Sequence, residues 1–120
     1  MSNWSRDLLG VKTYSEVFAT ASISAGSLTL NLQNAVNYEV SLNANITSLT
    51  VSNVPSGSTG FGLTFVGDGS RRTVTWPASF YWPNGEAPSI TSGSNKRDIL
   101  SFVTLNSGST WYGFVSGQNL

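Results

Sequence analysis

The sequence contains no cysteine and no histidine. Without cysteine there is no disulfide, no thiolate metal ligand and no thiol nucleophile. Without histidine the chain lacks the commonest general base and the commonest metal ligand. We therefore expect no metal site and no cofactor, and we expect that the protein is not an enzyme.

Charge is also scarce. Charged residues make up 10% of the 120 residues and the formal net charge is zero, whereas about 25% is usual in globular proteins. A neutral chain has no electrostatic footprint for nucleic acid or for an anionic membrane. No apolar run reaches the roughly 18 residues that span a bilayer, and the first residues do not have the pattern of a signal peptide. Low self-repulsion favours association, so we expect protein partners within an assembly.

The charged residues that exist do not form a recognisable reactive motif. The six carboxylates are scattered, with no Asp-x-Asp or Glu-x-x-Glu pair for acid/base work. The run Gly67-Asp68-Gly69 is typical of a turn and lacks the Gly-Lys-Ser/Thr of a phosphate loop. The basic pairs Arg71-Arg72 and Lys96-Arg97 could touch phosphate or an acidic partner. We interpret them as solvated strand ends.

Most of the chain alternates apolar residues with Ser, Thr and Asn. A period of two predicts half-buried strands, here over residues 27–33, 36–43, 46–52, 60–67, 72–76, 98–106 and 110–116. Hairpin turns are expected at Gln33-Asn34-Ala35 and at Asn106-Ser107-Gly108-Ser109. The pattern predicts an all-β domain over residues 20–120, an antiparallel β-sandwich with jelly-roll-like strand order. An immunoglobulin-like order fits the same signals.

Residues 1–19 have no clean period, and we expect an extended N-terminal arm there. Its apolar side chains need burial, either along the domain's own sheet or on a neighbouring subunit. The candidate subunit-docking residues are Trp4, Leu8, Leu9, Val11 and Tyr14.

The stretch 77–97 interrupts the alternation. It holds three of the four prolines and a run of three aromatic residues, and a long excursion within a compact domain is usually functional. Exposed rings can stack against a sugar, but aromatic residues are equally suited to a core or to a subunit interface. The candidate residues for a glycan or interface contact are Phe80, Tyr81, Trp82 and Asn84.

Several motifs in the C-terminal half resemble a domain found at the C-terminal ends of tail-fibre and related virion proteins of tailed bacteriophages. The resemblance covers residues 20–120 and is sharpest from Trp76 onward. The motifs are structural, not catalytic. They are Thr75-Trp76-Pro77, Trp82-Pro83-Asn84-Gly85-Glu86-Ala87-Pro88, Asp98-Ile99-Leu100-Ser101-Phe102-Val103-Thr104, Thr110-Trp111-Tyr112-Gly113-Phe114 and Gly117-Gln118-Asn119.

The resemblance implies a virion structural protein. In the fibre proteins the domain ends a much longer chain, whereas here it follows an N-terminal methionine and a short arm. That departure favours a capsid decoration (cement) protein on the capsid surface. Such proteins resemble trimers of β-sandwiches, so we expect a homotrimer whose main partner is the major capsid protein. The alternative is a tail or fibre-associated module that binds a receptor or glycan on the host surface.

Overall fold

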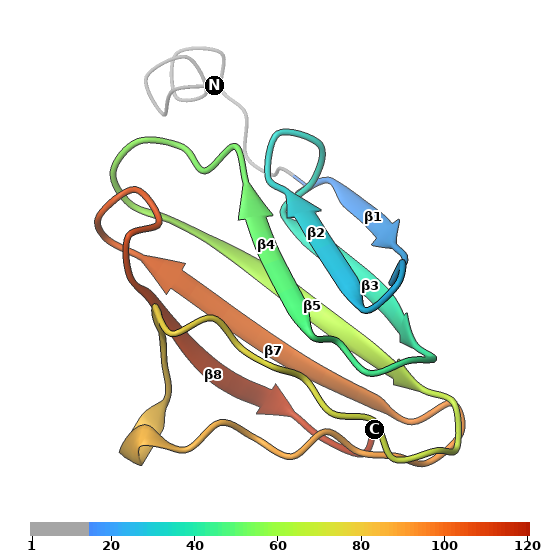
Figure 1. Ribbon diagram of the computed structural model, residues 1–120. Coiled ribbons are helices and arrows are strands. Elements are labelled where there is room, and N and C mark those ends of the chain that lie inside the picture. Colours follow the sequence, from blue (N-terminus) through green and yellow to red (C-terminus); the bar gives the residue numbers. More distant parts are fainter. Residues whose placement is uncertain (1–14) are drawn as a thin grey trace.

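A computed structural model describes residues 15–120, which form an all-β structure (Figure 1). The only helical element in this part of the chain is one 3-10 turn, η1 (Pro83–Gly85). No helix there has the length and hydropathy needed to cross a bilayer. The expected all-β class is confirmed. The strands are β1 (Phe18–Ala21), β2 (Ser27–Asn31), β3 (Asn37–Leu42), β4 (Ser48–Ser52), β5 (Thr59–Gly67), β6 (Phe80–Tyr81), β7 (Arg97–Thr104) and β8 (Trp111–Gly117).

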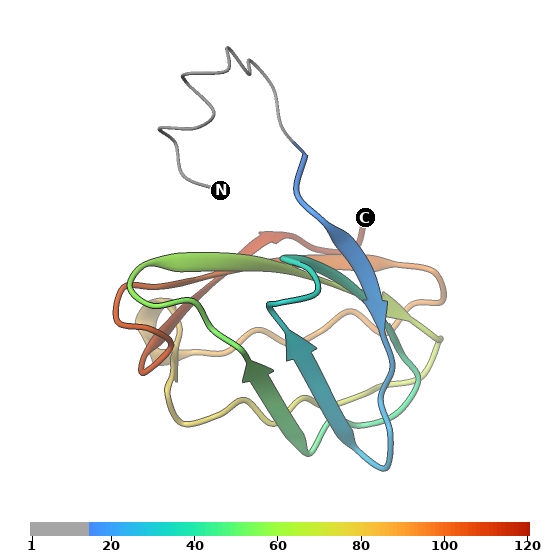
Figure 2. The same ribbon diagram turned by 90° about the horizontal axis from the view of Figure 1, so that it is seen from above.

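The strands form two layers. Six of them make a mixed sheet in the order β1-β3-β5-β7-β8-β6, and β2 and β4 make a second sheet of two strands. In Figure 2 the large sheet is seen edge-on, with β2 and β4 on one side of it. The extended chain between β5 and β7 lies on that same side (Figures 1 and 2). The hydrophobic core fills the space between the layers.

From β1 to β5 successive strands alternate between the two layers, so this part of the chain winds in coils. Neighbouring strands from successive coils are parallel, in the pairs β1–β3, β3–β5 and β2–β4. The register places Phe18 beside Asn37, 19 residues later in the chain, and Ser27 beside Ser48, 21 residues later. A parallel bridge between Ile46 and Val74 continues the second layer after β5. This winding, which adds one strand to each layer per coil, is that of a short β-helix.

The expected antiparallel pairing is correct only for β5, β7 and β8. The hairpin expected at residues 33–35 is wrong, because β2 and β3 lie in different layers. Alternation tells which side of a strand is buried, but not which strand lies beside it. The hairpin expected at residues 106–109 is confirmed, since it joins the antiparallel strands β7 and β8. The strand expected at 72–76 makes only the bridge at Val74.

Side chains at the corners fix one coil on the next. The Asn31 Oδ1 atom accepts hydrogen bonds from the Gln33 backbone N–H at 2.9 Å and from Asn53 Nδ2 at 2.9 Å. Asn53 has a φ of 54°, a left-handed conformation that Asn tolerates better than most residues. At an opposite corner the Thr47 N–H donates to the Gly26 carbonyl at 2.8 Å. These contacts make the register of the coils specific.

The large sheet begins at Phe18, inside the stretch expected to be an arm. The Val17 carbonyl accepts the N–H groups of Val36 at 3.1 Å and Asn37 at 3.2 Å. Residues 17–19 therefore contact β3 of the large sheet. The candidate docking residues Trp4, Leu8, Leu9, Val11 and Tyr14 lie outside the described residues.

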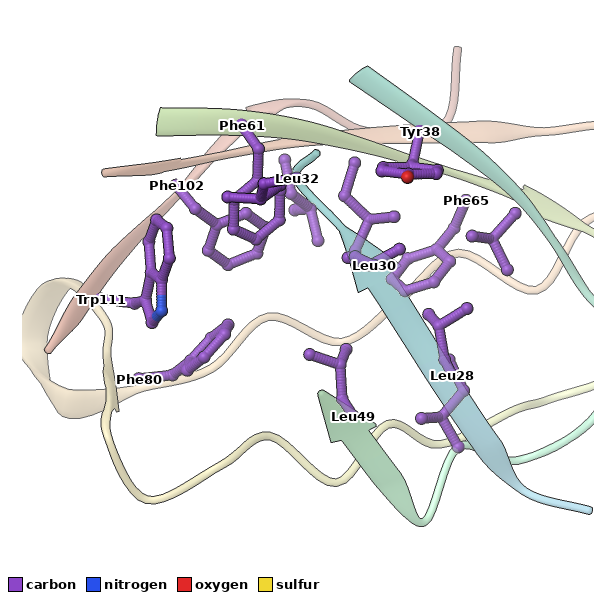
Figure 3. Close-up of a cluster of buried hydrophobic side chains, with 14 of the residues drawn as sticks. Leu28, Leu30, Leu32, Tyr38, Leu49, Phe61, Phe65, Phe80, Phe102 and Trp111 are labelled. Atoms are coloured by element: carbon purple, nitrogen blue, oxygen red, sulfur yellow. The ribbon is translucent and has the colours of Figure 1, made fainter. Parts of the chain in front are cut away.

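Four aromatic side chains gather at one end of the core, and leucines lie at the other end together with Tyr38 and Phe65 (Figure 3). Phe61 stacks on Phe102 with 4.7 Å between ring centroids, and its ring meets Trp111 edge-on at 5.0 Å. Leu28 and Leu30 come from the second layer and are 1% and 0% exposed. Full burial of such a side chain stabilises the fold by about 1.5–3 kcal/mol, so these residues hold the two layers together.

Candidate binding groove at the edge of β8

The edge of the large sheet is only partly covered by β6. This short strand pairs with the first two residues of β8, Trp111 and Tyr112. The strand pairs of residues 15–120 place no partner beside the rest of that edge, from Gly113 to Gly117. The segment 82–89 passes along it instead and leaves a groove, which we call the β8 groove.

The β8 groove consists of two adjoining cavities of about 530 and 360 Å³. Trp82, Pro83 and Phe114 line both of them. Volumes of this size are typical of small-molecule sites. The remaining lining residues are Glu86, Ala87, Pro88, Ser89 and Val115 in the larger cavity, and Tyr81, Tyr112 and Gly113 in the smaller.

The Trp82 ring packs directly on Gly113, in the space that a larger side chain at this position would occupy. A Cβ atom at Gly113 would lie 2.7 Å from Cζ3 of the Trp82 ring. The ring packs edge-on against Trp76 and Phe102, with centroid distances of 4.9 and 5.6 Å. Its Nε1 atom is buried and has no hydrogen-bond partner among the described residues. Trp82 therefore closes one end of the core and also forms a wall of the groove.

The four residues singled out in the sequence lie in different environments. Phe80 is 8% exposed and packs on Phe102 with 5.4 Å between ring centroids, so it lies in the core, and its glycan or interface contact stays a prediction. Tyr81 is 58% exposed and meets Tyr112 edge-on at 6.2 Å. Asn84 is exposed in η1 with a φ of 59° and lines neither cavity. Only Tyr81 and Trp82 belong to the groove.

Phe114 was not among the predicted site residues, although it lines both cavities and is 48% exposed. The signal was present in β8, where Trp111 and Gly113 face inward and Tyr112 and Phe114 face outward. Two aromatic residues on the outward positions of one strand indicate a surface that binds a ligand or another protein.

The chemistry of the groove is aromatic and nearly uncharged. Glu86 is the only charged residue among positions 15–120 that lines it, and the hydroxyls of Tyr81, Tyr112 and Ser89 supply polar groups. Such a surface suits stacking against an uncharged ring. Within residues 15–120 no group of three or more Asp, Glu, His or Cys side chains is arranged to hold a metal ion.

Asp98 is the one buried carboxylate of the described chain, at 1% exposure, and its contacts are structural. Its oxygens accept the N–H groups of Thr91 at 2.7 Å and Asn119 at 2.9 Å, and Gln118 Nε2 at 3.1 Å. Burial alone would raise the pKa of Asp98, but these hydrogen bonds together hold that pKa below its ordinary value. Asp98 ties the C-terminal tail to the segment beside the groove.

Comparison of the chain with protein-family models, with curated proteins and with solved structures found no match. A function is therefore inferred from the geometry described above and from the resemblance carried by the C-terminal motifs.

Proposed function

We propose that the chain is a structural protein of a tailed-phage virion, and that it decorates the capsid as a cement protein bound to the major capsid protein. The motifs that carry the resemblance have structural positions in this fold. Trp76 and Trp111 pack in or against the core, and Asp98 holds the C-terminal tail through Gln118 and Asn119. They support a shared fold whose residues serve packing.

The main support for this proposal is the unpaired edge of the first coil, which we call the open end. β1 and β2 form the first coil, and among residues 15–120 each is paired on one side only, with β3 and with β4. Neither strand contains a charged residue or a proline, the devices by which natural edge strands discourage further pairing. Val17 and Phe18 are 61% and 60% exposed beside this edge. An edge of this kind accepts a strand from a neighbouring subunit.

We classify the two facing layers as a β-sandwich wound like a β-helix and closed by the β7–β8 hairpin. A jelly roll is not proposed, because its neighbouring strands run antiparallel. The resemblance to decoration proteins makes a homotrimer on the capsid surface the proposed assembly.

A charge placed on the open edge tests the proposal. The Thr20 side chain is exposed on β1, and Thr20→Lys would put an ammonium group where a neighbour's strand would pack. We expect the variant to fold and to bind capsids that lack the protein at least about tenfold more weakly, since burying an unpaired charge is costly. Ser116→Lys on β8, exposed at the opposite end of the sheet, is the matched control. Equal co-sedimentation of the two variants with capsids would rule out docking through β1.

A tail or fibre-associated module that binds a host-surface glycan is the second candidate, and the β8 groove favours it. Tyr81, Tyr112 and Phe114 are 58%, 41% and 48% exposed along one edge, and the faces of such rings stack against sugars. We expect Phe114→Ala to weaken binding to host surface polysaccharide roughly tenfold, the loss of one good stacking contact. Phe18→Ala removes a ring that is 60% exposed at the opposite edge of the sheet and serves as the control. Failure of the intact protein to bind would reject this candidate.

A further inference from the structure

A separate cavity of about 470 Å³ lies between the chain that follows β5 and the chain that follows η1. Both segments belong to the second layer, and Figure 1 shows them as the yellow and orange traces beyond β4. Arg71 and Arg72 line this cavity together with Ser89 and Ser92. The basic pair was interpreted as solvated strand ends, but the structure places it in the wall of a cavity.

The wall of this cavity carries a net positive charge. Arg72 Nη2 forms an ion pair with Asp68 Oδ2 at 2.7 Å, and Asp68 Oδ1 accepts the Ser70 N–H at 3.0 Å. The Arg72 guanidinium is thereby held in one position. Two arginines against one aspartate leave one positive charge, and no carboxylate of the described residues lines the cavity itself.

One donor in this wall has no acceptor. Arg72 Nε is buried and makes no hydrogen bond to any residue in the described part of the chain. A buried donor without a partner costs about 1–3 kcal/mol. An anionic oxygen in the cavity would reach this donor only after a shift of the Arg72 side chain that exposes Nε. Arg71 is exposed on the same wall and adds a second guanidinium, the group that binds carboxylate and phosphate most specifically.

The rest of the lining has the character of a sugar site. Val74, Pro88 and Ile90 provide apolar contact, and the hydroxyls of Ser89 and Ser92 can hydrogen-bond to a ring. A cavity of about 470 Å³ lies in the size range of small-molecule sites. We propose that this cavity binds an acidic saccharide, with the carboxylate or phosphate group of the sugar on Arg71 and Arg72.

This site is distinct from the β8 groove. Pro88 and Ser89 line both, so the segment that carries them separates a cationic cavity from a groove where Glu86 is the only charged lining residue within the described chain. The inference goes beyond the proposed function and does not depend on whether the protein lies on the capsid or on the tail.

Titration of the full chain with three sugars, followed by NMR of the arginine side-chain N–H signals, tests the inference. D-glucuronate carries a carboxylate, D-glucose 6-phosphate carries a phosphate, and D-glucose carries neither. We expect one or both acidic sugars to shift the Arg71 and Arg72 signals in a saturable way, and D-glucose to leave them unchanged. The stronger of the two acidic sugars identifies the acid group.

Arg71→Gln is the informative variant, because Arg71 is exposed and outside the ion pair with Asp68. Loss of its charge-assisted hydrogen bonds should weaken binding of the acidic sugar at least about tenfold. Arg97→Gln removes the same charge from β7, where Arg97 faces Glu39 at 3.6 Å, and should leave binding unchanged. Equal weakening in both variants, or no saturable shift in the intact chain, would overturn the inference.

Discussion

Asp98 shows at the scale of a single residue how a buried charge becomes part of the fold. The folded-state pKa of this carboxyl lies below its ordinary value because the backbone N–H groups of Asn119 and Thr91 and the amide of Gln118 outweigh the opposing effect of burial. Its contribution to stability is therefore complete above the unfolded pKa of about 3.9. It is lost as the pH falls through the lower folded-state pKa.

We expect Asp98→Asn to lower the free energy of unfolding by about 1–3 kcal/mol at pH 6, because an amide NH₂ would face N–H donors that now have an acceptor. Urea unfolding measured at pH 6 and at pH 3 checks this. The difference between wild type and variant should shrink at pH 3, because below the unfolded pKa the charge of Asp98 no longer adds its full stability. A difference that is the same at both pH values would contradict the structural role of the charge.

Gly113 is a second residue whose identity is set by packing. Its hypothetical Cβ would lie 2.8 Å from Cη2 of Trp82 and 3.0 Å from Cε1 of Phe102. We expect Gly113→Ala to destabilise the fold by about 1–3 kcal/mol, as overpacking commonly does.

The double-mutant cycle with Trp82→Phe isolates this contact. The smaller ring makes room, so Gly113→Ala should cost less than half as much in the Trp82→Phe background. Additive effects of the two substitutions on the urea midpoint would show that the Trp82 ring does not restrict the size of the side chain at position 113.

The sequence alone could not sort the aromatic residues of the 77–97 stretch. Three consecutive rings suggested one exposed platform, but the structure buries Phe80 and exposes Tyr81. Phe80 and Tyr81 point to opposite sides because β6 pairs with β8, a strand far away in the sequence. A local pattern does not contain that contact, so the groove was predicted only in part and Phe114 was missed.

At the scale of elements, the β7–β8 hairpin depends on one buried hydroxyl. Thr104 is fully buried, donates to Asn106 Oδ1 at 3.0 Å and accepts the Gly108 N–H at 2.9 Å. We expect Thr104→Val, which keeps the shape, to lower the free energy of unfolding by about 1–3 kcal/mol because the Gly108 N–H loses its acceptor. Thr64→Val on β5, where no side-chain hydrogen bond is made within residues 15–120 and the side chain is only half-buried, is the control. Equal costs in chemical denaturation would contradict the capping role.

Strand positions were predictable because exposed and buried residues alternate along each strand, as in β2 and β7. Strand partners were not, because the turn after β2 contains ordinary turn residues and does not reveal that the chain changes layers. The hairpin after β7 was predictable because its own residues cap it, through Thr104 and Asn106. Local chemistry fixed that turn, whereas the coils are fixed by contacts between strands about 20 residues apart.

At the scale of the whole molecule, the two ends of the stack differ. β1 and β2 leave one end open, and the antiparallel hairpin of β7 and β8 lies toward the other end (Figure 1). Deletion of residues 1–14 tests how the open end is used. The truncated chain keeps Val17, whose carbonyl is bonded to β3, and should unfold at nearly the same temperature as the full chain. If residues 1–14 help to dock the protein, the truncated chain should no longer join capsids, and undiminished decoration would reject that role.

The number of copies of this protein per purified virion tests the central claim most directly. It can be measured by quantitative mass spectrometry against the major capsid protein. A cement protein should be present in hundreds of copies, in a fixed ratio to the shell. A few copies per particle would contradict placement on the capsid and would favour a tail location with the β8 groove as the receptor site, and absence from particles would contradict the virion assignment itself.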